Sequence, residues 1–307
     1  MTAVKPTFLA RIGLIICLFV PSAGWASDAV DRFRFGISVG AEQDIRERIE
    51  PFRVALEEIL DLPVDLYLIE TMGGLVDALA KGEIDYARLS PSAYAAVHTL
   101  CACVEPLAAA RPDSISDRFY SIMVGRRTAD QTALADLEGG LLGISGAPSV
   151  AGYRVPLANL AADGVDARRH FRALVRIKDP LDGLRAVLDG RIDAALAWST
   201  LAGNARTGYS AGSLNDLYAS GAKGLEKLVV VWRSPGIPYS AHTVRLALPD
   251  EFKRRLRAGL LDIRDTAPDA YLAVEPDYPG GFEPVVHTDF RAVLRTYDPD
   301  LRATLDP

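Results

Sequence analysis

Small hydroxyl residues follow buried apolar runs at matching points in the two halves of the sequence. Ser90–Ser92 follows one such run, and Trp198–Thr200 follows the other. In open parallel sheets, ligands sit beyond the carboxyl ends of the strands, where a following helix offers backbone N–H groups and the positive end of its dipole. Both segments therefore favour the binding of an anion or a polar neutral ligand. Because Ser and Thr are also ordinary helix N-caps, a purely structural role is the alternative at each position.

A third candidate ligand loop spans Gly143–Pro156 and contains Ser149. It follows the predicted strand Leu141–Ser145, and its glycines allow the backbone to approach a ligand closely. The loop lacks the Gly-Lys-Ser/Thr of a Walker loop, and Ala147 stands where a nucleophile elbow would have its last glycine. The pattern therefore predicts a binding loop at a helix start.

Cys101 and Cys103 lie one residue apart, just beyond the helix predicted to begin at Ser92. Their spacing is compatible with a strained disulfide, with an intermolecular bridge, or with two thiols that bind a soft metalloid. A fourth interpretation is a pair of small apolar side chains near the end of a buried helix. The sequence leaves all four open.

Catalytic machinery is not evident in the sequence. The histidines occur in no recognised motif, and no HExxH or zinc-type Cys/His spacing is present. No carboxylate pair stands out from solvated surface charges. We therefore expect a protein that is not an enzyme and needs no cofactor or metal. Structural or surface roles are expected for the four histidines, His98, His170, His242 and His287.

The N-terminus reads as a cleavable signal peptide of residues 1–26, which predicts a periplasmic protein. Lys5 and Arg11 precede the apolar run Ile12–Val20, and the small-x-small site Gly24–Ala26 follows. Cys17 is not expected to be lipidated, because Ile16 before it is too large for the usual small residue at that position.

Composition and charge describe a soluble globular chain. Of the 307 residues, 49% are hydrophobic and 24% are charged. Removing residues 1–26 takes away Lys5, Arg11 and no acid, so the net charge changes from -6 to -8. Without a basic field, nucleic-acid binding is excluded as a function class.

Strand and helix patterns alternate from Phe33 to about Leu248. A strand over Phe33–Val39 precedes a helix, and Val64–Ile69 reads as the next strand. The helix has apolar residues spaced by three and four, so one stripe faces a core: Ile45, Ile49, Phe52, Leu56 and Ile59. This alternation predicts an α/β fold with mostly parallel strands.

An internal echo relates the two halves of the chain. Val76–Ala87 recurs 108 residues later as Leu184–Ala195, with matching Ala, Gly, Ile and Asp positions. Each copy reads as an amphipathic helix ended by a glycine, Gly82 or Gly190, in the left-handed region, followed by a strand. The echo predicts two similar lobes.

Several modest motifs, taken in order, resemble the PhnD-like phosphate/phosphite/phosphonate periplasmic binding proteins, the solute receptors of ABC importers. The resemblance extends from about Phe33 to Leu261. It implies a two-lobed type II periplasmic-binding fold with the ligand in the cleft and a transporter permease as partner. The segments that carry it are Glu42–Leu60, Gly82–Tyr94, Pro148–Pro156, Gly183–Ala195 and Ser234–Pro238.

The family's ligand residues match this sequence in part. Tyr94 matches the cleft tyrosine, and Ser149 matches the first hydroxyl of the family's Ser-Thr-Ser anion loop. The remaining positions depart from the pattern, because Val150 and Ala151 replace the other two hydroxyls and Met72 replaces a first-lobe tyrosine. Each lost hydroxyl removes a hydrogen bond worth up to about 1–3 kcal/mol if its partner stays buried. Pro180 falls near the family's ligand histidine.

Two other functions stay open at this point. Some relatives resemble this family in fold but act as periplasmic arsenite sensors that bind through cysteine and signal to a membrane histidine kinase. Cys101 and Cys103 make that soft-ligand function the leading alternative. An exported α/β enzyme is the second, and it would be indicated by His98 or His242 lying in the cleft beside a carboxylate and a nucleophile.

The expected architecture has lobe one in residues 28–118 plus 233–307 and lobe two in residues 119–232. The crossings Phe119–Val124 and Leu228–Trp232 are expected to act as hinges. We expect a small oxyanion to lie in the cleft, where residues of both lobes contact it. Ser92 in lobe one and Ser149 in lobe two are each expected to start a helix whose N-terminus faces the cleft. The predicted ligand residues are Met72, Ser92, Tyr94, Ser149, Val150, Ala151, Trp198 and Ser199.

Overall fold

The computed structural model describes residues 1–2, 30–40, 44–112, 116–127 and 133–302. The predicted signal peptide, with Cys17, lies outside these residues except for its first two. Among the described residues, we find no helix both long and apolar enough to cross a membrane.

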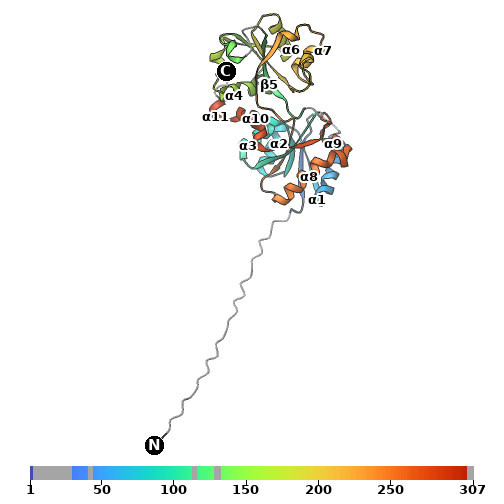
Figure 1. The fold of residues 1–307 in the computed structure, drawn as a ribbon. Coiled ribbons are helices and arrows are strands. Elements are labelled where there is room, and N and C mark those ends of the chain that lie inside the picture. The colour runs from blue at the N-terminus through green and yellow to red at the C-terminus, as the bar shows by residue number, and fades with distance from the viewer. Residues whose placement is uncertain (3–29, 41–43, 113–115, 128–132, 303–307) are drawn as a thin grey trace.

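Two β-sheets form the centres of two bodies, which are stacked one above the other in Figure 1. The first sheet has six strands in the order β11-β4-β10-β3-β1-β2. Its strands are β1 (Phe33–Ser38), β2 (Val64–Ile69), β3 (Tyr86–Leu89), β4 (Val104–Ala110), β10 (Ala241–Arg245) and β11 (Phe282–Pro284). The helices beside it are α1 (Ile45–Leu60), α2 (Met72–Lys81), α3 (Pro91–Cys101), α8 (Asp250–Thr266) and α9 (Pro268–Val274).

The second sheet has five strands in the order β7-β6-β8-β5-β9. Its strands are β5 (Tyr120–Arg126), β6 (Leu141–Ile144), β7 (Ala173–Arg176), β8 (Ala194–Ser199) and β9 (Leu228–Arg233). Its helices are α4 (Val155–Ala162), α5 (Ala167–His170), α6 (Pro180–Leu188) and α7 (Ser213–Ala219), and a π-helical turn, η2 (Val150–Arg154), precedes α4. Short 3-10 turns are η1 (Leu134–Leu137), η3 (Ala205–Thr207) and η4 (Leu225–Lys227).

The two sheets share one strand order, and this explains the sequence echo. Five strands of the first sheet, in the order β2-β1-β3-β10-β4, correspond one by one to the second sheet, β7-β6-β8-β5-β9. In this correspondence α2 and β3 match α6 and β8, the two copies of the echo. Gly82 and Gly190 both adopt positive φ, 76° and 73°, as the echo predicts. The expected stripe of α1 faces a core, with Ile45, Ile49, Phe52 and Leu56 buried.

Three strands run against the common direction of the other strands in their sheets. β1 pairs in parallel with β2 and β3, and β6 pairs in parallel with β7 and β8. β10 and β5, however, are antiparallel to both of their neighbours. Each of these two strands is the first one in the sequence after the chain crosses from the other sheet. It therefore runs into its sheet from the end opposite to that at which its neighbours begin. β11 is also antiparallel to its neighbour β4. The prediction of mostly parallel strands is therefore confirmed for β1–β4 and β6–β9, which run in one direction within their sheets, and fails at β5, β10 and β11.

The chain passes between the sheets twice, between β4 and β5 and between β9 and β10. The two passages are joined to each other, because Phe119 and Ile237 exchange backbone hydrogen bonds of 3.0 and 2.8 Å. Ser234 adds a third bond by accepting from the Ser121 amide at 3.1 Å. The crossing runs named from the sequence, Phe119–Val124 and Leu228–Trp232, lie largely within β5 and β9 themselves.

A third link is made by residues 287–302, which we call the C-terminal strap. It comprises η5 (His287–Phe290), α10 (Arg291–Leu294), η6 (Arg295–Tyr297) and α11 (Pro299–Arg302). Figure 1 shows α10 and α11 between α3 of the first body and α4 of the second. The buried Asn159 amide of α4 donates to the Ala292 carbonyl and accepts from Arg295, both at 2.9 Å. The strap therefore ties α4 to the first body.

An apolar cluster continues across this junction, and we call it the cross-lobe cluster. Val155 of α4 is fully buried in it together with Tyr94, Phe290 and Val293. At its edge lie Met72, Val150 and Tyr297, among others. Residues predicted as ligand contacts in both halves of the chain thus border one cluster.

Candidate functional site

The Ser149 loop starts the helical run of η2 and α4. The Ser149 side chain accepts from the Gly152 amide at 3.1 Å, and its carbonyl accepts from Arg154 at 3.0 Å. The first N–H groups of such a run, those of Val150 and Ala151, have no partner within the helix. A π-helical turn at this position widens the first turn, and such turns are frequent at functional sites. The predicted helix start at Ser149 is thus confirmed.

Glycine at position 152 allows this turn to close against β6. A Cβ on Gly152 would lie 2.4 Å from the hydroxyl of Ser145 and 3.0 Å from that of Ser149, so a larger residue would displace both. Ser145 is buried, and its hydroxyl has no hydrogen-bond partner among the described residues. Ser121 supports the same loop by donating to the Ala151 carbonyl at 2.6 Å. Sequence reasoning missed Ser145 and Ser121, although the position of Ser145 at a strand end was a usable signal.

Trp198 and Ser199 lie beside the Ser149 loop, because β8 and η2 pack together. The helix expected to start at Trp198–Thr200 is not found there. Ser199 is fully buried and accepts from the Leu201 amide at 3.1 Å, while Thr200 bonds to the Ser210 hydroxyl at 2.8 Å. These bonds close a loop before η3, so the prediction that a helix starts here is wrong. The Trp198 ring meets Phe119 edge-on, with centroids 6.2 Å apart.

In the first body, Ser90 rather than Ser92 caps α3. The Ser90 hydroxyl accepts from the Ala93 amide at 3.2 Å, and Pro91 occupies the first helical position. The prediction that Ser92 starts the helix is therefore off by two residues. Ser90, Ser92 and Met72 line a groove of about 380 Å³, with Tyr297 of the strap beside them.

Tyr94 lies away from that groove, inside the cross-lobe cluster. Its ring is fully buried 4.6 Å from Phe290, and its hydroxyl bonds to Nδ1 of His287 at 2.8 Å. Burial raises the pKa of the Tyr94 phenol, and the charge of Glu105 adds to that rise, so the group stays protonated. In this arrangement Tyr94 holds the strap rather than a ligand.

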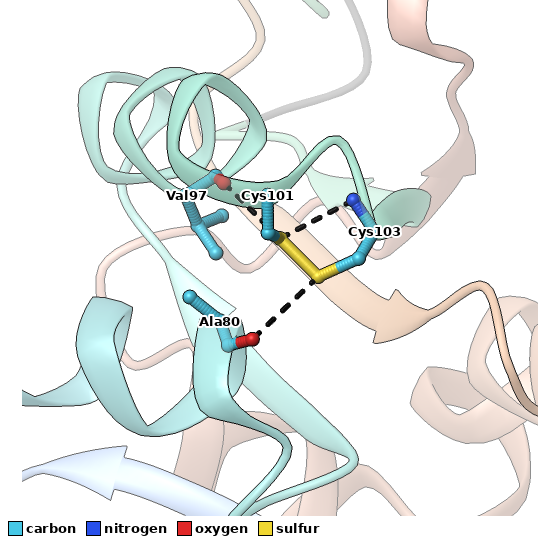
Figure 2. Close-up of a disulfide and its surroundings, with 4 residues drawn as sticks. All are labelled: Ala80, Val97, Cys101 and Cys103. Carbon is cyan, nitrogen blue, oxygen red and sulfur yellow. Dashed lines mark hydrogen bonds between the residues drawn. A yellow bond between two sulfur atoms is a disulfide. The ribbon is translucent and has the colours of Figure 1, made fainter.

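Cys101 and Cys103 are joined in a disulfide at the C-terminal end of α3 (Figure 2), with sulfurs 2.09 Å apart. Ala102 between them has a positive φ of 46° and ends the helix. Closing so short a loop stabilises a fold by only about 1.5 kcal/mol in the loop-entropy model. With the sulfurs bonded to each other there is no thiolate, so a soft metalloid would need the reduced protein.

His242 lies in the core of the first body, in a buried chain of polar groups. Its Nδ1 bonds to the Tyr86 hydroxyl at 2.5 Å, and its Nε2 bonds to Glu275 at 2.9 Å. Arg88 completes the chain with a 2.8 Å ion pair to Glu275. Burial lowers the pKa of His242 and outweighs the nearby Glu275 carboxylate, so the ring is neutral. This is a carboxylate beside a histidine, but both side chains are fully buried and the partner is a tyrosine rather than a nucleophilic Ser or Cys.

The remaining histidines lie in two places, a pair and a single residue. His98 and His287 lie between α3 and the strap, and His170 bonds to the Leu134 carbonyl at 3.1 Å. In the part of the chain that the structure describes, no three His, Cys, Asp or Glu side chains are grouped to hold a metal ion.

Comparison with known proteins identifies the relatives of this architecture. The family model described as "ABC transporter, phosphonate, periplasmic substrate-binding protein" matches residues 36–290. Among solved structures, XAC2383 from Xanthomonas citri bound to chloride ion is 17% identical with a TM-score of 0.53, over 90% of this chain and 97% of that one. Transferrin 1 from Manduca sexta is 13% identical with a TM-score of 0.59, over 89% of this chain and 47% of that one. At such identities these structures show the fold, and with the family match they confirm the predicted two-lobed type II fold.

Proposed function

Because the chain belongs to the family of periplasmic substrate-binding proteins of phosphonate ABC transporters, we propose that it binds a phosphate, phosphite or phosphonate between its lobes and delivers it to a membrane permease. The periplasmic location follows from the family, and export by the signal peptide of residues 1–26 is part of the proposal. The proposal includes no catalytic step, since the family is one of substrate-binding transporter components.

The single observation that supports an oxyanion most strongly is the Ser149 loop. A helical run of 13 residues, η2 followed by α4, starts there with the Ser149 hydroxyl and the amides of Val150 and Ala151 at its positive end. A helix start of this kind attracts an anion through its N–H groups and its dipole. Since Val150 and Ala151 bring no hydroxyls, the backbone must supply most of the hydrogen bonds.

The other ligand contacts are proposed around this loop. Ser92 and Met72 would approach from the groove of the first lobe, and Trp198 from the wall of the second, while Ser199 fixes that wall from within. The lobes of residues 28–118 plus 233–307 and of residues 119–232 would close on the ligand about the joined passages at Phe119 and Ile237. The strap spans both lobes and would limit how far they separate.

Thermal unfolding with a panel of oxyanions tests the proposal. Phosphate, phosphite or methylphosphonate should raise the melting temperature, since a ligand that binds only the folded state stabilises it. Ser149→Ala should weaken binding by about 10- to 150-fold, the equivalent of one hydrogen bond to a charged group. Asp166→Ala is a matched control, because it removes the N-cap of α5 in the same lobe without touching the loop.

Two outcomes would reject the oxyanion. One is a melting curve that none of the three anions moves. The other is a shift caused by arsenite after reduction and abolished by Cys101→Ser or Cys103→Ser, which would support a metalloid sensor that signals to a histidine kinase.

A further inference from the structure

A second groove lies between α3 and the C-terminal strap, on the side of α3 that carries His98. Its volume is about 460 Å³. Much of its lining is apolar, but hydrogen-bond donors lie among it: His98 and Thr99 from α3 and His287, Thr288 and Arg291 from the strap. A carboxylate from Asp298 is also present. The protein as a whole is acidic, so a groove of this composition is a local exception.

The two histidine rings of this groove lie against each other. Their centroids are 4.1 Å apart and their planes are inclined by 33°. Nδ1 of His287 is occupied by the Tyr94 hydroxyl, which leaves Nε2 for another partner. Among the described residues, no hydrogen bond reaches the His98 ring or the Arg291 guanidinium. The groove therefore holds donors that the protein itself leaves unused.

We propose that this groove is a second anion site, separate from the interlobe site, which binds a small tetrahedral oxyanion when His98 and His287 are protonated. With neutral rings the charged groups are Arg291 and Arg295 against Asp298. Protonation adds two positive charges at ring contact distance, and an anion that lies beside both rings offsets their mutual repulsion.

The groups around the pair set the direction of the pH dependence. Burial lowers the pKa of His287, and the positive charge of His98 lowers it further. Arg291, Arg295 and Asp298 line the same groove from the strap and carry one net positive charge between them. Tyr94 stays neutral. A bound anion offsets the repulsion between the rings, so the binding of anion and proton is coupled. The affinity for the anion therefore rises as the pH falls through the range in which histidine titrates.

Anion binding in this groove is expected to affect the link between the two lobes, because the strap contacts both. Arg295 contacts Asn159 at 2.9 Å and Asp163 at 3.7 Å, both on the second lobe. An anion that holds the strap to α3 therefore also holds the link between the lobes, whereas protonation without an anion weakens it.

Histidine NMR provides a direct test, because the chain has four histidines. Sulfate is the probe, since it remains a dianion across the pH range used, and sodium chloride of equal ionic strength is the control for screening. At about pH 5.5, sulfate should shift the ring signals of His98 and His287 in a saturable manner and should raise the pKa of His287. The signals of His170 and the buried His242 should not move. At about pH 8 the affinity should be at least tenfold lower, as expected when two nearby charges are lost.

Variants separate this site from the interlobe site. Arg291→Gln should weaken the sulfate effect on His98 and His287, while Arg254→Gln, an exposed arginine on α8, should leave it unchanged. Ser149→Ala should also leave it unchanged, so failure of the oxyanion function would not hide this site. The proposal is overturned if the His98 and His287 signals ignore sulfate, if chloride moves them equally, if Arg291→Gln has no effect, or if Ser149→Ala abolishes the response.

Discussion

Replacing Glu275 by alanine should lower the free energy of unfolding by about 3–5 kcal/mol, the usual cost of leaving one partner of a buried ion pair alone. The carboxylate is fully buried between Nε2 of His242 and the guanidinium of Arg88. Its removal would leave Arg88 without its buried partner and His242 without one of its two hydrogen bonds. Urea denaturation at neutral pH measures the effect.

Two further variants separate charge from hydrogen bonding at this position. Glu275→Gln keeps an acceptor for His242 but loses the charge that faces Arg88, so its destabilisation should be smaller than that of Glu275→Ala. Glu251→Gln is the control, because this carboxylate is 81% exposed and its pair with Arg254 should contribute less than about 1 kcal/mol. Equal, small effects for Glu275→Ala and Glu251→Gln would show that the buried chain does not stabilise the fold.

Lowering the pH should destabilise the fold through the same buried polar groups. Burial alone would raise the pKa of Glu275, but the His242 hydrogen bond and the Arg88 charge more than offset burial and lower the pKa to about 2. A carboxyl with a lowered pKa stabilises the fold fully above its unfolded value of 4.5, and that contribution, about 3 kcal/mol, is lost as the pH falls towards 2. The lowered pKa of His242 acts in the same direction, because charging the buried ring in acid is unfavourable. Glu275→Gln should flatten the acid limb of the stability curve.

Gly152→Ala should abolish most oxyanion binding, by at least tenfold, at a stability cost of about 1–3 kcal/mol. The new methyl group would lie 2.8 Å from the Ser145 Cβ, so the loop must shift and its N–H groups lose their alignment. Isothermal titration with the tightest oxyanion of the panel measures the loss.

A rescue and a matched glycine make this result specific. Removing the Ser145 side chain in Gly152→Ala/Ser145→Gly takes away the nearest obstacle and should restore part of the affinity. Gly125→Ala in β5 is the control, because its Cβ would meet neighbours at an ordinary 3.6 Å. Normal binding by Gly152→Ala alone would mean that the Ser149 loop does not contact the ligand.

Local patterns were enough to predict most of the fold. The α1 stripe and the two helix-glycine-strand units depend on residues close in sequence, and repetition of the unit revealed the two lobes. The α3 cap could have been placed correctly, since Pro91 at the first helical position indicates a cap at Ser90. By contrast, the antiparallel direction of β10 and β5 follows from the crossings and has no local signal.

Contacts between segments far apart in the sequence could not be predicted from local patterns. Asn159 and Ala292 meet across 133 residues, and Tyr94 and His287 meet across 193. Tyr94 fits the family pattern in its position along the chain, yet the strap turns it into a packing residue. The buried polar chain likewise joins three elements, with Tyr86 and Arg88 from β3, His242 from β10 and Glu275 from the end of α9. None of these residues stands out in the sequence on its own.

A crystal structure of the protein grown with methylphosphonate tests the central claim most directly. We predict that the phosphonate lies between the lobes, with its oxygens at hydrogen-bond distance from the Ser149 hydroxyl and the amides of Val150 and Ala151. A phosphonate bound elsewhere, with those three groups free of it, would contradict the proposed site.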